Sequence, residues 1–380
     1  MLEDPAGVLS MYVDAAPERA AGERPGWDVA VRNQLRALER TLKTDDGSSE
    51  RWLVLSNRLA NLDEDLARLL DPRQPGRGRA MFVPLSNGEP RSITLQLPLR
   101  DRVVLQQRPY IRPLVGALAA GGAAGVGVVS RSGVRVHEWR CGVIEEMAWF
   151  GFRRDTSDWR EMKGPAAANP ALTQHTAPQR DRFARRLEER RAAFLRSTGK
   201  RLAQLAAARD WQLVLLTGDP RLVGPLHASL AVDARELVCA PWKLESLSQA
   251  QLAATVADEL SAARLRGQVS LADRLRDEAL AGGSVSLGLD ETLRALEEGR
   301  VSHLLIDAQR EYHGGRGSDD RVVAHAPLAG EARGELDGEP DLGEQMVERA
   351  LQTRAMITPL EPPAAERLAN CDGVAGLLRW

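Results

Sequence analysis

The residues best able to do chemistry are a glutamine in a proline-rich stretch and the arginines that follow it. Residues 164–178 read GPAAANPALTQHTAP and carry the amide of Gln174 near their far end. This composition is typical of a projecting surface loop. A glutamine amide is no base near neutral pH, but it can orient an attacking water against an ester carbonyl. Gln174 is therefore the candidate catalytic residue, with Gln179 as a second candidate.

A strongly basic helix is predicted directly after this loop. Between Arg180 and Arg201, nine Lys and Arg residues accompany three acids, whereas the whole chain has a net charge of −2. Such a local excess of cations favours a polyanion, most commonly nucleic acid, over a merely solvated face. The predicted core face of the helix comprises Phe183, Leu187, Phe194, Leu202 and Leu205. The candidate RNA-binding residues are Lys163, Arg180, Arg182, Arg185 and Arg186.

The loop and the basic helix together resemble the central domain of the archaeo-eukaryotic peptide release factors, whose loop ends in Gly-Gly-Gln. The resemblance is closer to their bacterial relatives, which are similar to the eukaryotic factor that frees stalled chains from large ribosomal subunits during quality control. Balon-type hibernation factors are more distant relatives. Here Leu172-Thr173-Gln174 replaces Gly-Gly-Gln. Because β-branched Thr173 disfavours positive φ, the loop either presents Gln174 differently or only occupies its site.

Three segments are expected along the chain, with boundaries at 1–107, 108–242 and 243–380. The pattern predicts a mixed α/β protein. The resemblance implies a small N-terminal α/β domain with a helical hairpin, a ribonuclease-H-like middle domain that carries the catalytic loop, and a C-terminal αβα domain like the kink-turn-binding ribosomal proteins. In the family, that last domain docks onto a translational GTPase or another partner.

Hydrophobic periodicity places the expected elements within these segments. The first segment has a strand at 8–13, helices at 29–42 and 51–70, and strands at 79–85 and 92–97. The second has a helix ending at 120, strands at 125–130, 134–139 and 211–216, a helix at 221–230 and a strand starting at 237. The third has helices at 246–266, 269–281, 289–298 and 343–353, strands at 301–307, 355–359 and 373–380, and a polar loop at 312–342.

Other classes of protein find little support in the sequence. No apolar run reaches the ~18 residues of a membrane span, and the N-terminus lacks the basic residues of a secretory signal. Three widely spaced cysteines suit a reducing cytoplasm. We find no phosphate-binding loop or Cys/His cluster, so no cofactor and no metal are expected. A nuclease on the ribonuclease-H-like scaffold is a weaker alternative, for which only Asp219 and Glu138 lie in suitable places.

The sequence therefore predicts a cytoplasmic transfer-RNA mimic that binds the ribosome, with the large subunit, ribosomal RNA and peptidyl-tRNA as partners and no membrane. Its leading predicted activity is hydrolysis of peptidyl-tRNA, which releases nascent chains from stalled large subunits. The alternative is a non-catalytic hibernation factor that sits in the ribosomal A site. The missing Gly-Gly-Gln favours this alternative, whereas the retained Gln174 favours the enzyme.

Overall fold

The protein divides into two compact units. The computed structural model describes residues 4–20, 24–44, 49–86, 88–153, 176–230, 236–316, 322–324 and 341–380, and the side chains of 49–51, 176–183, 315–316 and 322–324 lie outside that description. Residues 1–121 and 264–380 form the first unit, and residues 122–263 form the second. The three predicted domain boundaries stay a prediction. Among the described residues, no helix is long and apolar enough to cross a membrane.

The N-terminal part of the first unit is a small antiparallel sheet covered by helices. Its strand order is β3-β2-β1-β4, and the predicted hairpin helices pack on one face. Trp27, Val31 and Leu35 of the first helix are buried in one cluster with Leu9 and Met11 of the central strand. The elements are β1 (Val8–Asp14), α1 (Gly26–Thr44), α2 (Ser49–Ala60), α3 (Asp63–Leu70), β2 (Gly78–Pro84), β3 (Arg91–Leu95) and β4 (Arg102–Gln106).

Two features of this part differ from the prediction. The single helix expected at 51–70 is two helices, α2 and α3, because the chain breaks at the buried Leu62. Three acids, Asp63 to Asp65, begin α3, where they favour the positive end of a new helix dipole. Strand β4 was not predicted. Its sequence, RVVLQ, is short and lacks an alternation of apolar and polar residues, and the strand is half-buried throughout.

The C-terminal part of the first unit is the predicted αβα arrangement. Its mixed sheet has the order β10-β15-β11-β14, and β11 pairs in parallel only with β14. Helices α9 and α10 pack on one face of the sheet. Helices α8 and α11 pack on the other. The bounds are α8 (Gln249–Leu280), β10 (Val285–Leu287), α9 (Leu289–Glu297), β11 (Val301–Asp307), α10 (Leu342–Gln352), β14 (Met356–Leu360), α11 (Pro362–Ala365) and β15 (Val374–Leu378).

Helix α8 corrects the prediction of two helices at 246–266 and 269–281. It is continuous through Gly267, whose cost in a helix interior is about 1 kcal/mol. Ala272 and Leu275 beyond it are fully buried, and their packing outweighs that cost. Its N-terminal capping pair is Ser248 and Gln251, since Ser248 N–H donates to Gln251 Oε1 at 3.1 Å and Gln251 N–H donates to Ser248 Oγ at 3.4 Å.

The polar insert at 312–342 was predicted to be a loop throughout, and this was wrong in part. It contains a short antiparallel pair of strands, β12 (Gly314–Arg316) and β13 (Val322–Ala324). Strand β10 was also not predicted, since three residues are too few to show a period.

The second unit is a five-stranded sheet of order β7-β6-β5-β8-β9. Strands β5, β8 and β9 are parallel, whereas β6 and β7 are antiparallel to their neighbours. This order, with a central first strand, is the ribonuclease-H-like topology that the resemblance implied. The bounds are β5 (Ala124–Val129), β6 (Gly133–Arg140), β7 (Val143–Gly151), α6 (Thr176–Ala208), β8 (Leu213–Gly218), α7 (Pro220–Leu230) and β9 (Glu236–Ala240).

Helix α6 packs its C-terminal half on this sheet. Leu195, Leu202 and Ala206 are buried in one cluster with Val214 and Leu216 of β8. The buried stripe differs from the expected one, because Leu195 is buried whereas Phe194 is only half-buried, and the side chain of Phe183 lies outside the described residues. A Cβ at Gly199 would collide with Ser229 of α7. Only glycine therefore allows the two helices their close approach.

Candidate nucleic-acid interface

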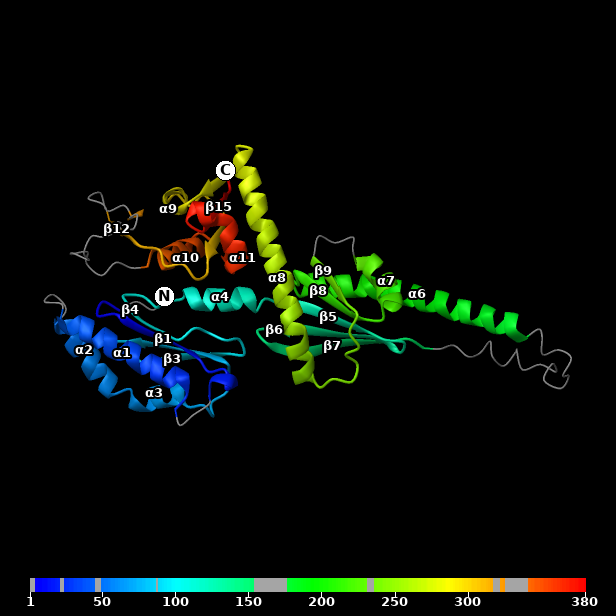
Figure 1. The fold of residues 1–380 in the computed structure, drawn as a ribbon, viewed down its shortest axis with the longest axis horizontal. Coiled ribbons are helices and arrows are strands. Elements are labelled where there is room, and N and C mark those ends of the chain that lie inside the picture. Colours follow the sequence, from blue (N-terminus) through cyan, green and yellow to red (C-terminus); the bar gives the residue numbers. More distant parts are fainter. Residues whose placement is uncertain are drawn as a thin grey trace. The chain divides into compact units, whose positions relative to one another are not determined.

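The N-terminal half of α6 is a projecting basic arm. The helix has 33 residues, which makes it roughly 50 Å long. Between Ala184 and Arg190 every side chain is exposed except that of Leu187, which is half-buried. Figure 1 shows α6 running past the end of the sheet formed by β5 to β9. The arm therefore offers its cations to solvent on most sides.

The structure describes some of the predicted site residues with their side chains, some by their backbone alone, and others not at all. Gln174 and Lys163 lie outside the described residues. Gln179, Arg180 and Arg182 lie in the first two turns of α6, and only their backbone is described. The side chains of Arg185 and Arg186 are exposed. The structure therefore brings five of the predicted residues onto one helix arm, while the catalytic role of Gln174 stays a prediction.

The charge of the described part of α6 remains strongly positive. From Ala184 to Arg201 there are seven Lys and Arg residues and two carboxylates. Within the part of the chain that the structure describes, no carboxylate lies at ion-pair distance from the four exposed cations Arg185, Arg186, Arg196 and Lys200. A surface of this kind binds phosphates through charge, without reading sequence.

Two further arginines of α6 have a structural contact that sequence reasoning missed. The guanidinium of Arg191 lies 5.3 Å from the ring centroid of Phe152, and that of Arg201 lies 5.8 Å from Phe150. Phe152 also packs against Phe194 at 5.4 Å between ring centroids. These contacts hold α6 to the edge strand β7. The aromatic run AWFGF at 148–152 was the available signal, but β7 was not among the predicted strands.

The nuclease alternative is contradicted by the register of the sheet. Glu138 pairs with Gly125 at the start of β5, whereas Asp219 follows Gly218, which pairs with Val129 at its end. Four residues of strand separate the two positions by roughly 13 Å. Glu138 instead accepts a hydrogen bond from Trp211 Nε1 at 2.8 Å. Among the described residues, no group of three or more potential metal ligands occurs.

A buried charge cluster lies in the first unit at α4 (Arg112–Ala120). Arg112 is 8% exposed and pairs with Asp341 at 3.2 Å. It also donates to the carbonyls of Asp307 and Arg310 at 2.6 and 2.7 Å. Glu344, 3% exposed, accepts the backbone N–H groups of Ile111 and Arg112 at 2.6 and 2.9 Å. We call Tyr110, Arg112, Asp341 and Glu344 the Arg112 cluster.

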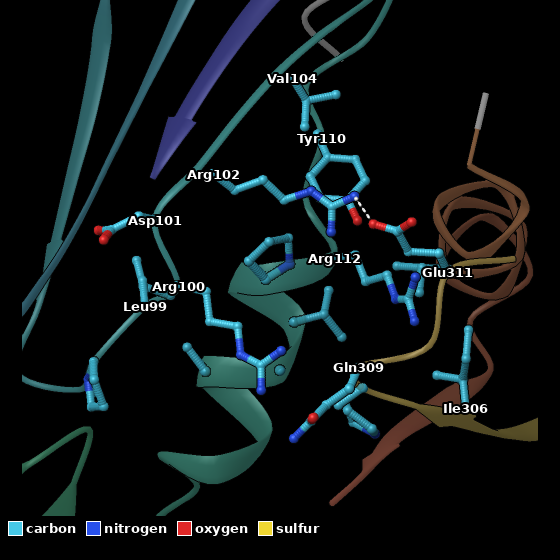
Figure 2. Close-up of a pocket in the computed structure, with 18 of the residues that line it drawn as sticks. Leu99, Arg100, Asp101, Arg102, Val104, Tyr110, Arg112, Ile306, Gln309 and Glu311 are labelled. Atoms are coloured by element: carbon cyan, nitrogen blue, oxygen red, sulfur yellow. Dashed lines mark hydrogen bonds and ion pairs between the residues drawn. The ribbon is translucent and has the colours of Figure 1, made fainter. Parts of the chain in front are cut away.

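A cavity of about 510 Å³ borders this cluster. Figure 2 shows Arg102 lying against the ring of Tyr110 and reaching toward Glu311. The Arg102–Glu311 ion pair is 3.5 Å long, and Arg102 stacks 4.8 Å from the Tyr110 centroid. The lining contains no serine, cysteine or histidine, so it offers neither a usual nucleophile nor an imidazole base.

Comparisons with known proteins give a family match for the middle of the chain. Residues 109–264 match the sequence model of bacterial archaeo-eukaryotic release factor family 10. This confirms the resemblance to release factors for the middle of the chain, which contains β5 to β9 and α6. The chain is also 21% identical over 226 residues to the uncharacterized protein YocB of Bacillus subtilis, covering 57% of this chain and 80% of that protein.

Solved structures give weaker likenesses. A model of ribosome-bound archaeal Pelota and ABCE1 is 16% identical, with a TM-score of 0.42, covering 80% of this chain and 77% of that chain. Dom34 of S. cerevisiae, described as a termination-like factor of RNA quality control that interacts with Hbs1, is 11% identical, with a TM-score of 0.38 and coverages of 77% and 73%. With TM-scores below 0.5, these likenesses carry no weight for function.

Proposed function

We propose that this protein is a translation factor that binds the large ribosomal subunit and releases nascent chains from peptidyl-tRNA on stalled subunits. The observation that carries the proposal is the projecting arm of exposed arginines on α6, in the segment that matches the release-factor family. In this proposal Arg180, Arg182, Arg185 and Arg186, together with Lys163, bind RNA phosphates. Long-range attraction between the arm and the phosphates would draw the factor to its site.

Gln174 then supplies the chemistry of release. It precedes the first residue of α6, Thr176, by two positions, so binding of the arm would carry it to the same site. Its amide would orient a water against the ester carbonyl of peptidyl-tRNA, or its backbone N–H would stabilise the developing oxyanion. No cofactor is required, because the surrounding RNA active site already positions the ester. The protein would act in the cytoplasm, where the ribosomes are.

The test is release of a labelled nascent chain from purified complexes of large subunits with peptidyl-tRNA. We expect release by the wild-type protein and a loss of roughly 100-fold on Gln174→Ala, the scale of losing one oxyanion donor. Gln179→Ala is the matched control, since it removes a second amide five residues away. Release lost only in Gln179→Ala would transfer the role to that residue. Absence of release by the wild-type protein would refute the proposed hydrolysis of peptidyl-tRNA.

One observation favours a second function, that of a non-catalytic ribosome-hibernation factor. Leu172 and Thr173 precede Gln174 where the release factors have two glycines, and neither adopts positive φ freely. Wild-type protein that binds large subunits tightly but releases no nascent chain would support this non-catalytic function. Binding of a translational GTPase through residues 243–380 belongs to either proposal, and co-sedimentation of such a GTPase with the protein would test it.

A further inference from the structure

Trp149 on the edge strand β7 has an exposed indole, unlike two other tryptophans of the second unit. It is 46% exposed, whereas Trp139 and Trp211 of the same sheet are 2% and 0% exposed. Its neighbours in the sequence, Phe150 and Phe152, pack against α6. Trp149 is therefore the one aromatic residue of this run that the core of the second unit does not use.

The indole is also held in a defined position. Trp149 lies opposite Arg135 of the neighbouring strand β6, and the Arg135 guanidinium lies 5.4 Å from the centroid of the indole ring. A Cβ at Gly151 would lie 3.2 Å from the indole Nε1, so the ring leans along the strand over a residue that has no side chain. An aromatic ring that is already placed loses little conformational entropy when a flat ligand stacks on it.

Three exposed arginines in this part of the sheet define the basic rim, which comprises Arg131, Arg135 and Arg153. Of the three, Arg135 contacts the indole. Arg131 lies in the turn between β5 and β6, and Arg153 follows β7. A hydrogen bond of 2.7 Å from Phe152 N–H to the Ser132 carbonyl brings both to one end of the sheet. Glu146 pairs with Arg135 at 3.5 Å, but both side chains are more than 40% exposed, so the pair is weak.

We propose that Trp149 is a stacking platform for an unpaired RNA base, with the basic rim contacting the phosphates beside that base. Single-stranded RNA is commonly bound by aromatic side chains that stack bases and by arginines that follow the backbone. The proposal rests on the proposed function, in which RNA is the partner. It adds a second contact on β7, the last described strand before the Gln174 stretch in the sequence.

The test compares two probes on the full-length protein. One is an unpaired RNA decamer, and the other is an abasic decamer with the same ribose-phosphate backbone. By fluorescence anisotropy, Trp149→Ala should weaken binding of the RNA decamer about tenfold and leave the abasic decamer unchanged. Trp149→Phe should retain an intermediate affinity. The matched control is Trp380→Ala, which removes an indole that is 68% exposed in the first unit and should change neither affinity.

Two outcomes would overturn the proposal that Trp149 stacks on an RNA base. One is equal weakening for both decamers in variants whose thermal unfolding matches the wild type. The other is no change for either decamer. The proposed function fails separately, since its own test uses large subunits. Protein that binds the decamer through Trp149 but does not bind large subunits would refute the proposed function alone. Protein that releases nascent chains with no effect of Trp149 would refute the platform alone.

Discussion

Arginines in the two units of this protein are held in opposite ways. Arg112 in the first unit is 8% exposed, and the two terminal nitrogens of its guanidinium donate to Asp341 and to two backbone carbonyls, whereas its buried Nε has no hydrogen-bond partner among the described residues. Arg185 and Arg186 in the second unit are exposed on a helix arm. Burial of a cation demands permanent partners, because an unpaired charge in the interior costs several kcal/mol. An exposed cation has no such requirement and stays available for a ligand.

The difference separates structural from functional charge. The Arg112 cluster joins residues that are more than 200 positions apart in the sequence, so it ties α4 to the C-terminal part of the first unit. On the α6 arm, Arg185 and Arg186 have no carboxylate at ion-pair distance within the part of the chain that the structure describes. Substitutions in the Arg112 cluster should therefore change stability and spare ligand affinity, whereas substitutions in the arm should do the reverse.

The largest effect is expected for Arg112→Ala. Removing one partner of a buried ion pair leaves Asp341 charged and unpaired, and should lower the free energy of unfolding by about 3–5 kcal/mol. Urea unfolding followed by circular dichroism measures this loss. The matched control is Arg185→Ala, which should stay within about 0.5 kcal/mol of the wild type. Equal losses of unfolding free energy in the two variants would contradict the division into structural and functional arginines.

A pH dependence should accompany the same cluster. Burial raises the pKa of Glu344 to about 7, against the lowering effect of the hydrogen bonds from Ile111 and Arg112. The folded state therefore binds a proton that the unfolded chain, with its ordinary pKa of 4.5, has lost. Stability from this group is fully present below pH 4.5 and is lost as the pH rises through 7. The loss is about 3 kcal/mol at most.

Urea unfolding at pH 5, 6, 7 and 8 checks this dependence. Glu344→Gln cannot titrate, so its stability should vary less over this range. It keeps one of the two oxygens that accept the N–H groups of Ile111 and Arg112, and its NH2 group replaces the other, which lowers its stability at every pH alike. Asp341, Glu348 and Arg112 face the same carboxyl and remain in the variant. An unchanged slope in Glu344→Gln would assign the pH dependence to another group.

The smallest free-energy effect is expected on the arm. The double variant Arg185→Gln/Arg186→Gln should bind large subunits several-fold more weakly and reduce the slope of log affinity against log salt by about one to two. The free energy of unfolding should not change. Neutralising acids on the same helix, in Glu188→Gln/Glu189→Gln, is the matched control and should strengthen binding. A double arginine variant with unaltered salt dependence would remove these residues from the interface.

Local patterns predicted most of the secondary structure. Apolar residues at helical spacing predicted α1, a short apolar run predicted β1, and an alternating run predicted β2. The resemblance implied the strand order of the second unit. Prediction failed where the signal was short or conflicting: β10 has three residues, and α8 passes through Gly267 because packing outweighs the local preference. Of the candidate site, sequence predicted the basic face of α6 but not its anchoring by Arg191 and Arg201 on β7.

The sequence by itself determined where positive charge gathers, since charge density and helical period are local properties of residues 180–201. Only the tertiary structure decided which arginines are free to act. Arg112 reads as an ordinary polar residue until the fold brings Asp341 and Glu344 to it, and the exposure of Trp149 follows only from the folded sheet. Burial and pairing are set by residues distant in sequence, so no local pattern contains them.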